Sequence, residues 1–285
     1  MRWTPGGRSA NLEDRRSAGR GFGFGGGGIR LGLGGIILLF ILSLVFKRDF
    51  FQLLNGTDGA PMGSATATDP ARDVREEPLV QFVSFVLDDA QNTWKQLLPS
   101  STGVPYRDAK LVLFRDGVNS ACGFAQSATG PFYCPEDQKV YIDLGFYDEL
   151  KNRFGASGDF AQAYVLAHEI GHHVQNLLGI ESQVRQAQRA NPGARNELSV
   201  RLELQADCLA GVWGHSTGQR NILEAGDVQK ALNAAAAIGD DRLERMSTGH
   251  VSPESFTHGT SAQRQQWFER GFTSGDPSAC NTFAQ

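Results

Sequence analysis

The residues best suited to chemistry form the stretch His168-Glu169-Ile-Gly-His172, near the middle of this 285-residue chain. Its surroundings favour an α-helix, in which residues four positions apart lie on one face. His168 and His172 can therefore direct two imidazole nitrogens toward one point, which suits a zinc ion. Glu169, rotated by about 100° around the helix, is placed to take a proton from a water that attacks a carbonyl. The pattern predicts one zinc ion per chain in a hydrolytic site.

Apolar residues surround this motif, so we expect the helix to be largely buried. They are Tyr164, Val165, Ala167, Ile170 and Val174. Buried imidazole and carboxylate groups need partners, and a metal ion supplies them. The alternative is a helix with two hydrogen-bonded histidines on a polar face, which these apolar neighbours disfavour.

A hydrolytic zinc site needs a third protein ligand, and the best candidates lie in a later stretch of helical propensity. There Glu203 and Asp207 are four residues apart and share one helix face. Two acids on a crowded face are costly unless they pair with a metal or a histidine. We predict Glu203 as the third metal ligand, and Asp207 as the acceptor that holds a ligand imidazole by its other N–H. The alternative is Asp207 as the ligand.

A later histidine, His258, follows Thr257 and precedes Gly259 in a loop before a predicted helix. Peptide hydrolysis needs a donor for the developing oxyanion, and His258 could supply it as a catalytic residue. Arg264 would then position His258 or an acidic neighbour. The alternative is a helix-capping loop with a solvated histidine.

The overall composition is that of a globular protein with a sizeable core, at 40% hydrophobic and 20% charged residues. The formal net charge of −4 gives no reason to expect a nucleic-acid partner. The length allows one large domain or two small ones. A peptide or protein substrate is expected from the hydrolytic zinc motif rather than from these quantities.

The N-terminal part differs from the rest in composition. Residues 1–28 are rich in arginine and glycine, which predicts a disordered cytoplasmic tail. Residues 31–46 carry no charge, and with their neighbours they predict a transmembrane signal anchor over 29–51. A cleaved signal peptide is the alternative, but small residues at a cleavage site are missing directly after the apolar run. The arginine excess before the anchor predicts a cytoplasmic N-terminus.

A polar linker over 52–77 then leads to a domain over 78–285. Pro78 is a natural first helical residue, and apolar residues follow at helical spacing as far as Pro99. We predict two strands, over residues 110–114 and 139–144. The second strand is either a sheet edge that binds an extended peptide or a plain core strand. We therefore expect an α+β fold that is mostly helical with a small β-sheet.

The four cysteines include no Cys-x-x-Cys pair, which argues against a cysteine-ligated metal. If the domain lies outside the cytoplasm, a disulfide between Cys122 and Cys134 is the natural pairing. A disulfide between Cys208 and Cys280 then follows by elimination.

The chain resembles the bacterial family described as putative neutral zinc metallopeptidases over roughly residues 75–285. The family's motifs appear here as Gly130 to Pro135, His168 to His172, Glu203 to Cys208 and Thr257 to Thr260. The resemblance implies a zincin-like metallopeptidase domain behind an N-terminal anchor, in the bacterial inner membrane with the domain on the periplasmic side.

A more distant similarity links the chain to HtpX-like zinc endopeptidases, through the Glu-x-x-x-Asp and His-x5-Arg spacings. In those families the glutamate binds zinc and the late histidine assists the transition state, which implies the same roles for Glu203 and His258. The combined reading is a single-pass, membrane-anchored zinc endopeptidase. The alternatives are a catalytically silent zinc-bearing envelope scaffold and a membrane-tethered binding module without a metal.

Overall fold

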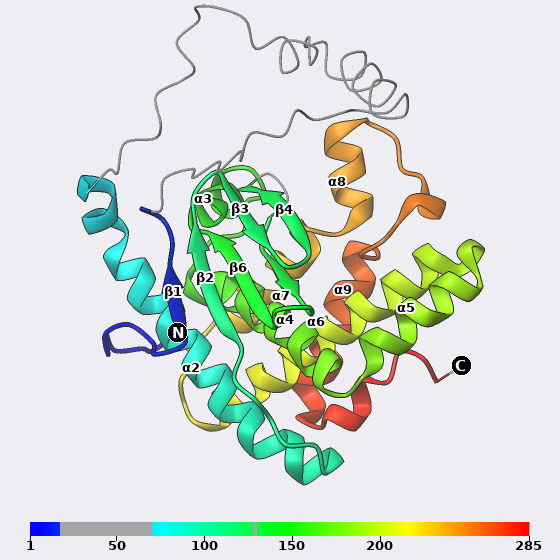
Figure 1. The fold of residues 1–285 in the computed structure, drawn as a ribbon, viewed down its shortest axis with the longest axis horizontal. Coiled ribbons are helices and arrows are strands. Elements are labelled where there is room, and N and C mark those ends of the chain that lie inside the picture. Colours follow the sequence, from blue (N-terminus) through cyan, green and yellow to red (C-terminus); the bar gives the residue numbers. More distant parts are fainter. Residues whose placement is uncertain (18–69, 128–129, 285) are drawn as a thin grey trace, which may run out of the picture. The chain divides into compact units, whose positions relative to one another are not determined.

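The computed structural model describes residues 1–17, 70–127 and 130–284 of the chain. In these residues helices predominate, and the strands form two small sheets (Figure 1). Met1–Ser17 and Pro70–Gln285 form one compact unit. The structure is therefore mostly helical with small sheets, as the apolar spacing of the sequence indicates.

The strands, apart from the short β1, lie between α2 and α3 in the chain, and helices make up the part that follows. In chain order the elements are β1 (Leu12–Asp14), α2 (Pro70–Thr102), β2 (Lys110–Phe114), β3 (Gly117–Ser120), β4 (Gly123–Gln126), β5 (Phe132–Cys134), β6 (Lys139–Asp143), α3 (Gly145–Asn152), α4 (Asp159–Leu177), α5 (Ile180–Ala190), η3 (Pro192–Ala194), α6 (Arg195–Gln219), α7 (Asp227–Ala237), α8 (Asp240–Ser247), η4 (Pro253–Ser255), α9 (Ser261–Ser274) and η5 (Pro277–Cys280).

The larger sheet has the strand order β1-β2-β6-β5, and β3 and β4 form a separate hairpin. β1, β2 and β6 are parallel, and β5 runs antiparallel to β6. All but the first residue of β2 and of β6 are buried, which is typical of parallel strands covered on both faces. The strand predicted over 139–144 is therefore a core strand rather than a sheet edge that could bind a peptide. β5 forms the edge next to β6.

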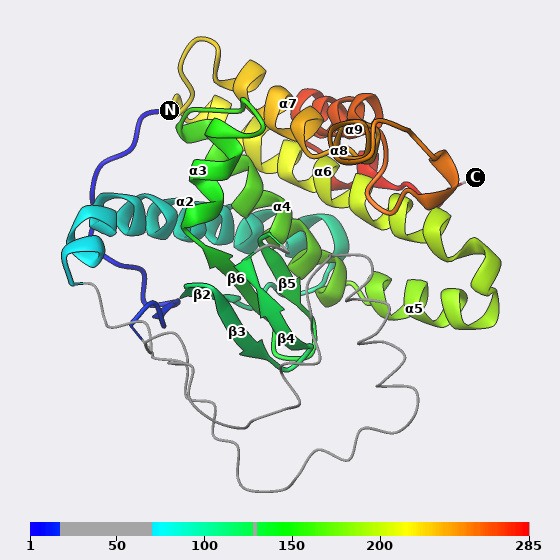
Figure 2. The same cartoon turned by 90° about the horizontal axis from the view of Figure 1, so that it is seen from above.

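Helix α4 lies between the sheet and α6, and it also contacts α2 and α7 (Figure 2). Its approach to α6 depends on Gly171, because a Cβ atom there would lie 2.9 Å from the carbonyl oxygen of Ala206. On α6, Gly211 allows a similar approach to α9, where a Cβ atom would lie 2.1 Å from the carbonyl oxygen of Phe268. Close contact between α4 and α6 brings side chains of both helices within reach of one ion.

The prediction of a transmembrane helix is corrected, and with it the single-pass location in the inner membrane. Within residues 1–17, 70–127 and 130–284, no helix combines the length and the apolar character needed to cross a bilayer. The longest of them, α2, carries charged residues along its first turns. The predicted anchor over 29–51 lies outside the described residues.

Met1–Ser17 is not the disordered tail that the composition predicts for 1–28, but part of the compact unit that contains Pro70–Gln285. β1 pairs with β2 at the edge of the sheet. The buried Arg16 guanidinium lies 2.8 Å from Asp14 and 2.7 Å from Glu76. These acids neutralise an arginine whose charge otherwise favours solvation, and Glu76 is distant in the sequence.

The helix predicted to begin at Pro78 begins at Pro70, so the last part of the predicted linker 52–77 is helical. An ion pair joins Arg72 and Glu76 across one turn, at 2.6 Å. Glu76 also lies 2.7 Å from Arg115 at the end of β2. Contacts with the sheet thus extend the helix beyond its apolar repeat.

Candidate metal centre

The side chains predicted to bind the metal converge between α4 and α6. Nε2 of His168 lies 3.2 Å from one carboxylate oxygen of Glu203, and Nε2 of His172 lies 3.5 Å from the other. All three ligand atoms lie within 4.8 Å of one another. Two atoms that each bind a tetrahedral zinc at about 2.05 Å are about 3.3 Å apart. These three residues therefore fit a zinc ion in both donor type and spacing.

The second nitrogen of each imidazole has its own acceptor. Nδ1 of His168 lies 2.8 Å from Oδ1 of Asp207, and Nδ1 of His172 lies 2.8 Å from Oε1 of Gln175. Because these acceptors favour a proton on Nδ1, the lone pair of Nε2 is left for a metal. Asp207 therefore occupies its predicted place behind His168. Gln175 was not predicted, although it lies three residues after His172 on the same helix face.

Charges at the ligand cluster perturb its titrating groups. Burial lowers the pKa of His168, but Asp207 and Glu203 outweigh it and raise this pKa to about 9. Burial raises the pKa of Glu203, but His172 and His168 outweigh it and hold this pKa well below its usual range. The cluster is thus organised around an ionised Glu203 that faces positive charge, and a divalent cation meets the same requirement.

Asp207 is the centre of a fully buried polar cluster. Its carboxylate accepts hydrogen bonds from the hydroxyl of Tyr164, at 2.5 Å, and from Nε and Nη2 of Arg264, at 2.8 and 2.9 Å. Burial opposes ionisation, but Arg264 and His168 lower the pKa of Asp207 to about 2. Of the two predicted roles for Arg264, it therefore fills the one of positioning an acidic neighbour. Tyr164, which the sequence presents as an apolar neighbour of the motif, contributes its hydroxyl.

Glu169 faces the same centre from α4 with 6% of its surface exposed. Burial raises its pKa, and the positive charges of His168 and His172 oppose this effect. Within the part of the chain that the structure describes, no group donates a hydrogen bond to its carboxylate. A desolvated carboxylate without donors is a stronger base than a solvated one, which suits the predicted role in proton transfer.

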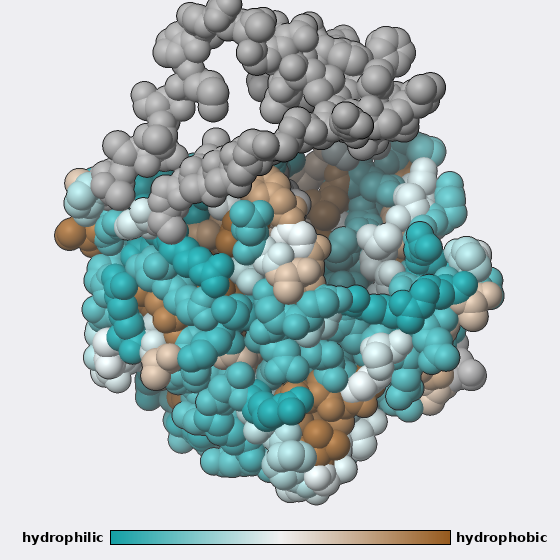
Figure 3. Space-filling model, in the orientation of Figure 1, coloured by the Kyte–Doolittle hydropathy of each residue, from teal (hydrophilic) through white to brown (hydrophobic). Residues whose placement is uncertain are grey.

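A cavity of about 550 Å³ opens in front of these residues. Its lining includes His168, Glu169, His172, Glu203, His258 and Arg264, together with residues of β5, α3 and α8. Figure 3 shows the surface hollowed beside the β3–β4 hairpin, with hydrophobic atoms inside the recess. The centre is thus accessible to a substrate, unlike a closed structural zinc site.

The loop that carries His258 is held by Asp240, the first residue of α8. One oxygen of Asp240 accepts the backbone N–H groups of Thr257, His258 and Gly259, at 2.7, 2.6 and 3.0 Å. The other lies 3.1 Å from Nδ1 of His258. The hydrogen bond to Asp240 raises the pKa of His258. Asp240 thus orients His258 and favours its protonated form, a role that the sequence analysis missed because Asp240 is 18 residues away.

The edge strand β5 is fastened to α4 by a second buried histidine. Nε2 of His173 lies 2.6 Å from the carbonyl oxygen of Arg107, so this nitrogen carries the proton. Nδ1 of His173 then accepts a hydrogen bond from the Tyr133 hydroxyl, at 2.9 Å, and Asn176 donates to the same hydroxyl, also at 2.9 Å. These contacts hold β5 beside α4, the helix that carries His168 and His172.

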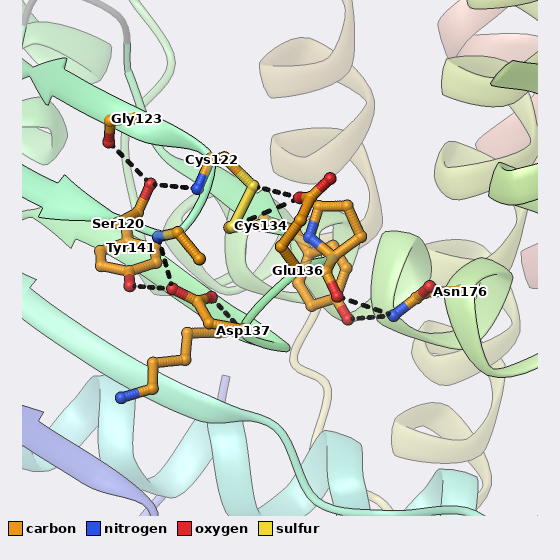
Figure 4. The surroundings of a disulfide bond; sticks show 12 residues. Ser120, Cys122, Gly123, Cys134, Glu136, Asp137, Tyr141 and Asn176 are labelled. Atoms are coloured by element: carbon orange, nitrogen blue, oxygen red, sulfur yellow. Dashed lines mark hydrogen bonds between the residues drawn. A yellow bond between two sulfur atoms is a disulfide. The ribbon is translucent and has the colours of Figure 1, made fainter.

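The structure pairs Cys122 with Cys134 and Cys208 with Cys280, as predicted. The first disulfide joins the turn of the β3–β4 hairpin to the end of β5, with Glu136 beside it (Figure 4). The second ties α6 to η5 near the C-terminus. Two disulfides are typical of proteins that fold in an oxidising compartment.

Comparisons with known proteins agree with the donor set. A family model described as "Putative neutral zinc metallopeptidase" matches residues 1–283. The uncharacterized protein YpfJ of Escherichia coli (strain K12) is 51% identical over 290 residues, which cover 100% of this chain and 99% of that protein. The uncharacterized proteins Mb2605 of Mycobacterium bovis and Rv2575 of Mycobacterium tuberculosis are each 47% identical over 202 residues, covering 67% of this chain and 66% of theirs. No solved structure matches.

Proposed function

We propose that this chain, which belongs to the putative neutral zinc metallopeptidase family, is a zinc-dependent endopeptidase that uses Glu169 as its general base. The observation that carries the proposal is the convergence of His168, His172 and Glu203 on one point in the wall of an open cavity. Three protein ligands leave a coordination position for water or substrate, as hydrolytic zinc sites require.

Each residue of the centre has its own role in hydrolysis. His168, His172 and Glu203 would hold the zinc, which when bound polarises the scissile carbonyl and lowers the pKa of the attacking water. Glu169 takes the proton from that water as its oxygen attacks the carbonyl carbon. Glu169 then delivers the proton to the leaving amine nitrogen as the C–N bond breaks. Asp207 fixes the orientation of His168 throughout.

His258 is proposed to donate a hydrogen bond to the oxygen that gains negative charge in the transition state. Its side chain lines the same cavity as Glu169, and its Nδ1 atom lies 3.1 Å from Oδ1 of Asp240. This arrangement leaves Nε2 as the donor toward the substrate. An extended peptide would lie along β5, whose outer edge offers backbone groups for pairing.

Replacing the oxyanion donor should slow turnover without releasing the metal. In His258→Ala, we expect kcat to fall about 10²- to 10³-fold, while KM changes by less than about threefold, because the interaction forms only in the transition state. Steady-state kinetics and metal analysis check this. The matched control is His250→Ala, since His250 is exposed in the same connection and does not line the cavity. A rise in KM with unchanged kcat would instead assign His258 to substrate binding.

The proposed function is tested by digestion of an unstructured protein such as reduced, alkylated casein. We expect internal cleavage with zinc, loss of cleavage with a chelator, and recovery when zinc is restored. Bound zinc without cleavage of any unstructured substrate would favour the scaffold alternative. Cleavage that persists in the chelated protein would exclude the metal from the reaction.

A further inference from the structure

We infer that one end of the cavity is a pocket that selects a bulky apolar side chain of the substrate, next to the bond that is cleaved. This inference rests on the proposed function, and it names the substrate class: peptides with leucine, phenylalanine or a similar residue beside the scissile bond. It concerns the walls of the cavity rather than the metal ligands.

The apolar walls of this pocket come from four separate elements and from one loop. They are Phe146 of α3, Phe154 after α3, Val165 of α4, Ile238 at the end of α7 and Leu243 of α8. Val165 and Phe154 are buried, whereas the other three are partly buried and packed against the main core. Folding therefore assembles a concave apolar surface that the sequence does not present as one stretch.

The pocket adjoins the reacting groups. Val165 lies four residues before Glu169 on α4, so both side chains are on one helix face, one turn apart. The carbonyl oxygen of Ile238 accepts a hydrogen bond from Arg264, at 3.3 Å. Leu243 lies one turn after Asp240, the residue that holds His258. A side chain in this pocket would thus belong to a residue directly beside the scissile bond.

Two charged residues, Glu149 and Arg153, line the cavity next to this pocket. The guanidinium of Arg153 lies 5.3 Å from the centre of the Phe154 ring and 4.0 Å from Glu149. Both charged side chains are more than half exposed, at 63% and 54%, so each keeps much of its hydration. Arg242 donates a hydrogen bond to the carbonyl oxygen of Phe154, at 2.8 Å, which fastens α8 to this wall. An apolar side chain gains from burial here, whereas a charged one loses its hydration against the apolar walls.

Other lining residues have a different chemistry. They include Tyr133 of β5 and Glu181 of α5. Tyr133 offers a hydroxyl, and Glu181 is ion-paired with Arg185 at 2.7 Å. Selection by an apolar side chain is therefore expected on one side of the scissile bond only.

The preference is measured with fluorogenic peptides that are identical except at the two positions flanking one cleavable bond, where alanine, leucine, phenylalanine, lysine or aspartate is placed. For the zinc-loaded wild type we expect kcat/KM to be about 10- to 200-fold higher with leucine or phenylalanine than with alanine at one of these positions. Aspartate and lysine at that position should be cleaved more slowly than alanine.

The pocket itself is tested with Leu243→Glu, a change on a partly exposed helix face. We expect the ratio of kcat/KM for the leucine peptide to that for the alanine peptide to fall at least tenfold. The lysine peptide should then be cleaved with a higher kcat/KM than the leucine peptide, because the new carboxylate can pair with the lysine ammonium. Leu243→Ala is the second variant, in which a widened pocket should favour phenylalanine over leucine. The control is Met246→Glu, because Met246 lies on the same helix, is 48% exposed and does not line the cavity.

The outcomes separate this inference from the function on which it rests. The pocket assignment is wrong if zinc-dependent cleavage shows no preference at either position, or if both Leu243 variants keep the wild-type preference. Either result leaves the proposed peptidase activity unaffected. If no peptide is cleaved in a zinc-dependent way, the proposed peptidase activity is wrong, and the pocket assignment that rests on it is wrong as well. A changed preference in the Leu243 variants, with Met246→Glu unchanged, supports the pocket.

Discussion

Glu169→Gln is expected to lower kcat by about 10²- to 10⁴-fold while one zinc ion per chain stays bound, because the amide cannot accept a proton from the attacking water. The ligands His168 and His172 are untouched, and glutamine keeps the shape of the side chain. Burial raises the pKa of Glu169, so its charged form is less favourable in the folded than in the unfolded protein. Without bound zinc, the variant should therefore be at least as stable as the wild type at neutral pH. Turnover, metal content and thermal unfolding are measured on the same preparation.

The matched control for this variant is Glu149→Gln. Glu149 lines the same cavity, but its side chain is 54% exposed, and among the described residues its ion-pair partner is Arg153. Its replacement removes the same charge from the cavity and should change kcat by less than about threefold. Wild-type turnover in zinc-loaded Glu169→Gln would remove Glu169 from proton transfer, and equal losses in both variants would point to net charge instead.

Glu203→Ala is expected to weaken zinc binding by more than the 10- to 100-fold typical of losing a residue that only supports a ligand. Glu203 is the acid whose two oxygens face the two imidazole Nε2 atoms, at 3.2 and 3.5 Å. Without it the metal keeps two protein ligands, and activity at limiting zinc should disappear. Competition with a chromophoric chelator measures the affinity, and excess zinc should restore part of the activity.

Two further variants make this result specific. Glu197→Ala removes an exposed acid of the same helix, whose ion-pair partner within the described ranges is Arg201, and its zinc affinity should match that of the wild type. Asp207→Asn should weaken zinc binding only about 10- to 100-fold, because Asp207 contacts His168 rather than the metal position. If Glu203→Ala bound zinc normally and Asp207→Asn did not, the alternative ligand assignment would be correct.

The local parts of the centre follow from sequence spacing. Because the α-helix repeats every 3.6 residues, His168 and His172 had to share a face, as did Glu203 and Asp207. The pairing of the two helices did not follow from spacing, since it depends on Gly171 lying against the backbone of Ala206. Chemical reasoning about buried acids was enough to place Asp207 beside a ligand imidazole.

Partners that are distant in sequence were missed. Asp240 resembles any helix-initiating acid until folding brings the loop of His258 against it. The hydroxyl of Tyr164 is one turn from His168, but only α6 and α9 provide Asp207 and Arg264 as its neighbours. Sequence patterns report periodicity within an element, and they carry little information about which loop packs against which helix.

The N-terminal part shows the limits of composition. Arginine-rich residues predicted disorder, because isolated charges favour water, yet Arg16 is buried between Asp14 and the distant Glu76. The apolar run over 29–51 predicted a membrane anchor with the domain on the far side. The described residues contain no helix that is long and apolar enough to cross a membrane, which corrects that prediction, and Met1–Ser17 packs with the domain.

By itself, the sequence determined the His-Glu-x-x-His motif, the helical character of the elements that carry the candidate ligands, and the most economical cysteine pairing. Each of these depends on spacing or on a small number of combinations. Only the tertiary structure decided that Asp240 orients His258, that β5 is the edge strand beside the cavity, and that Leu243 and Val165 share a wall. Those relations arise from packing between elements, where the free energy depends on shapes and charges that meet only in the folded chain.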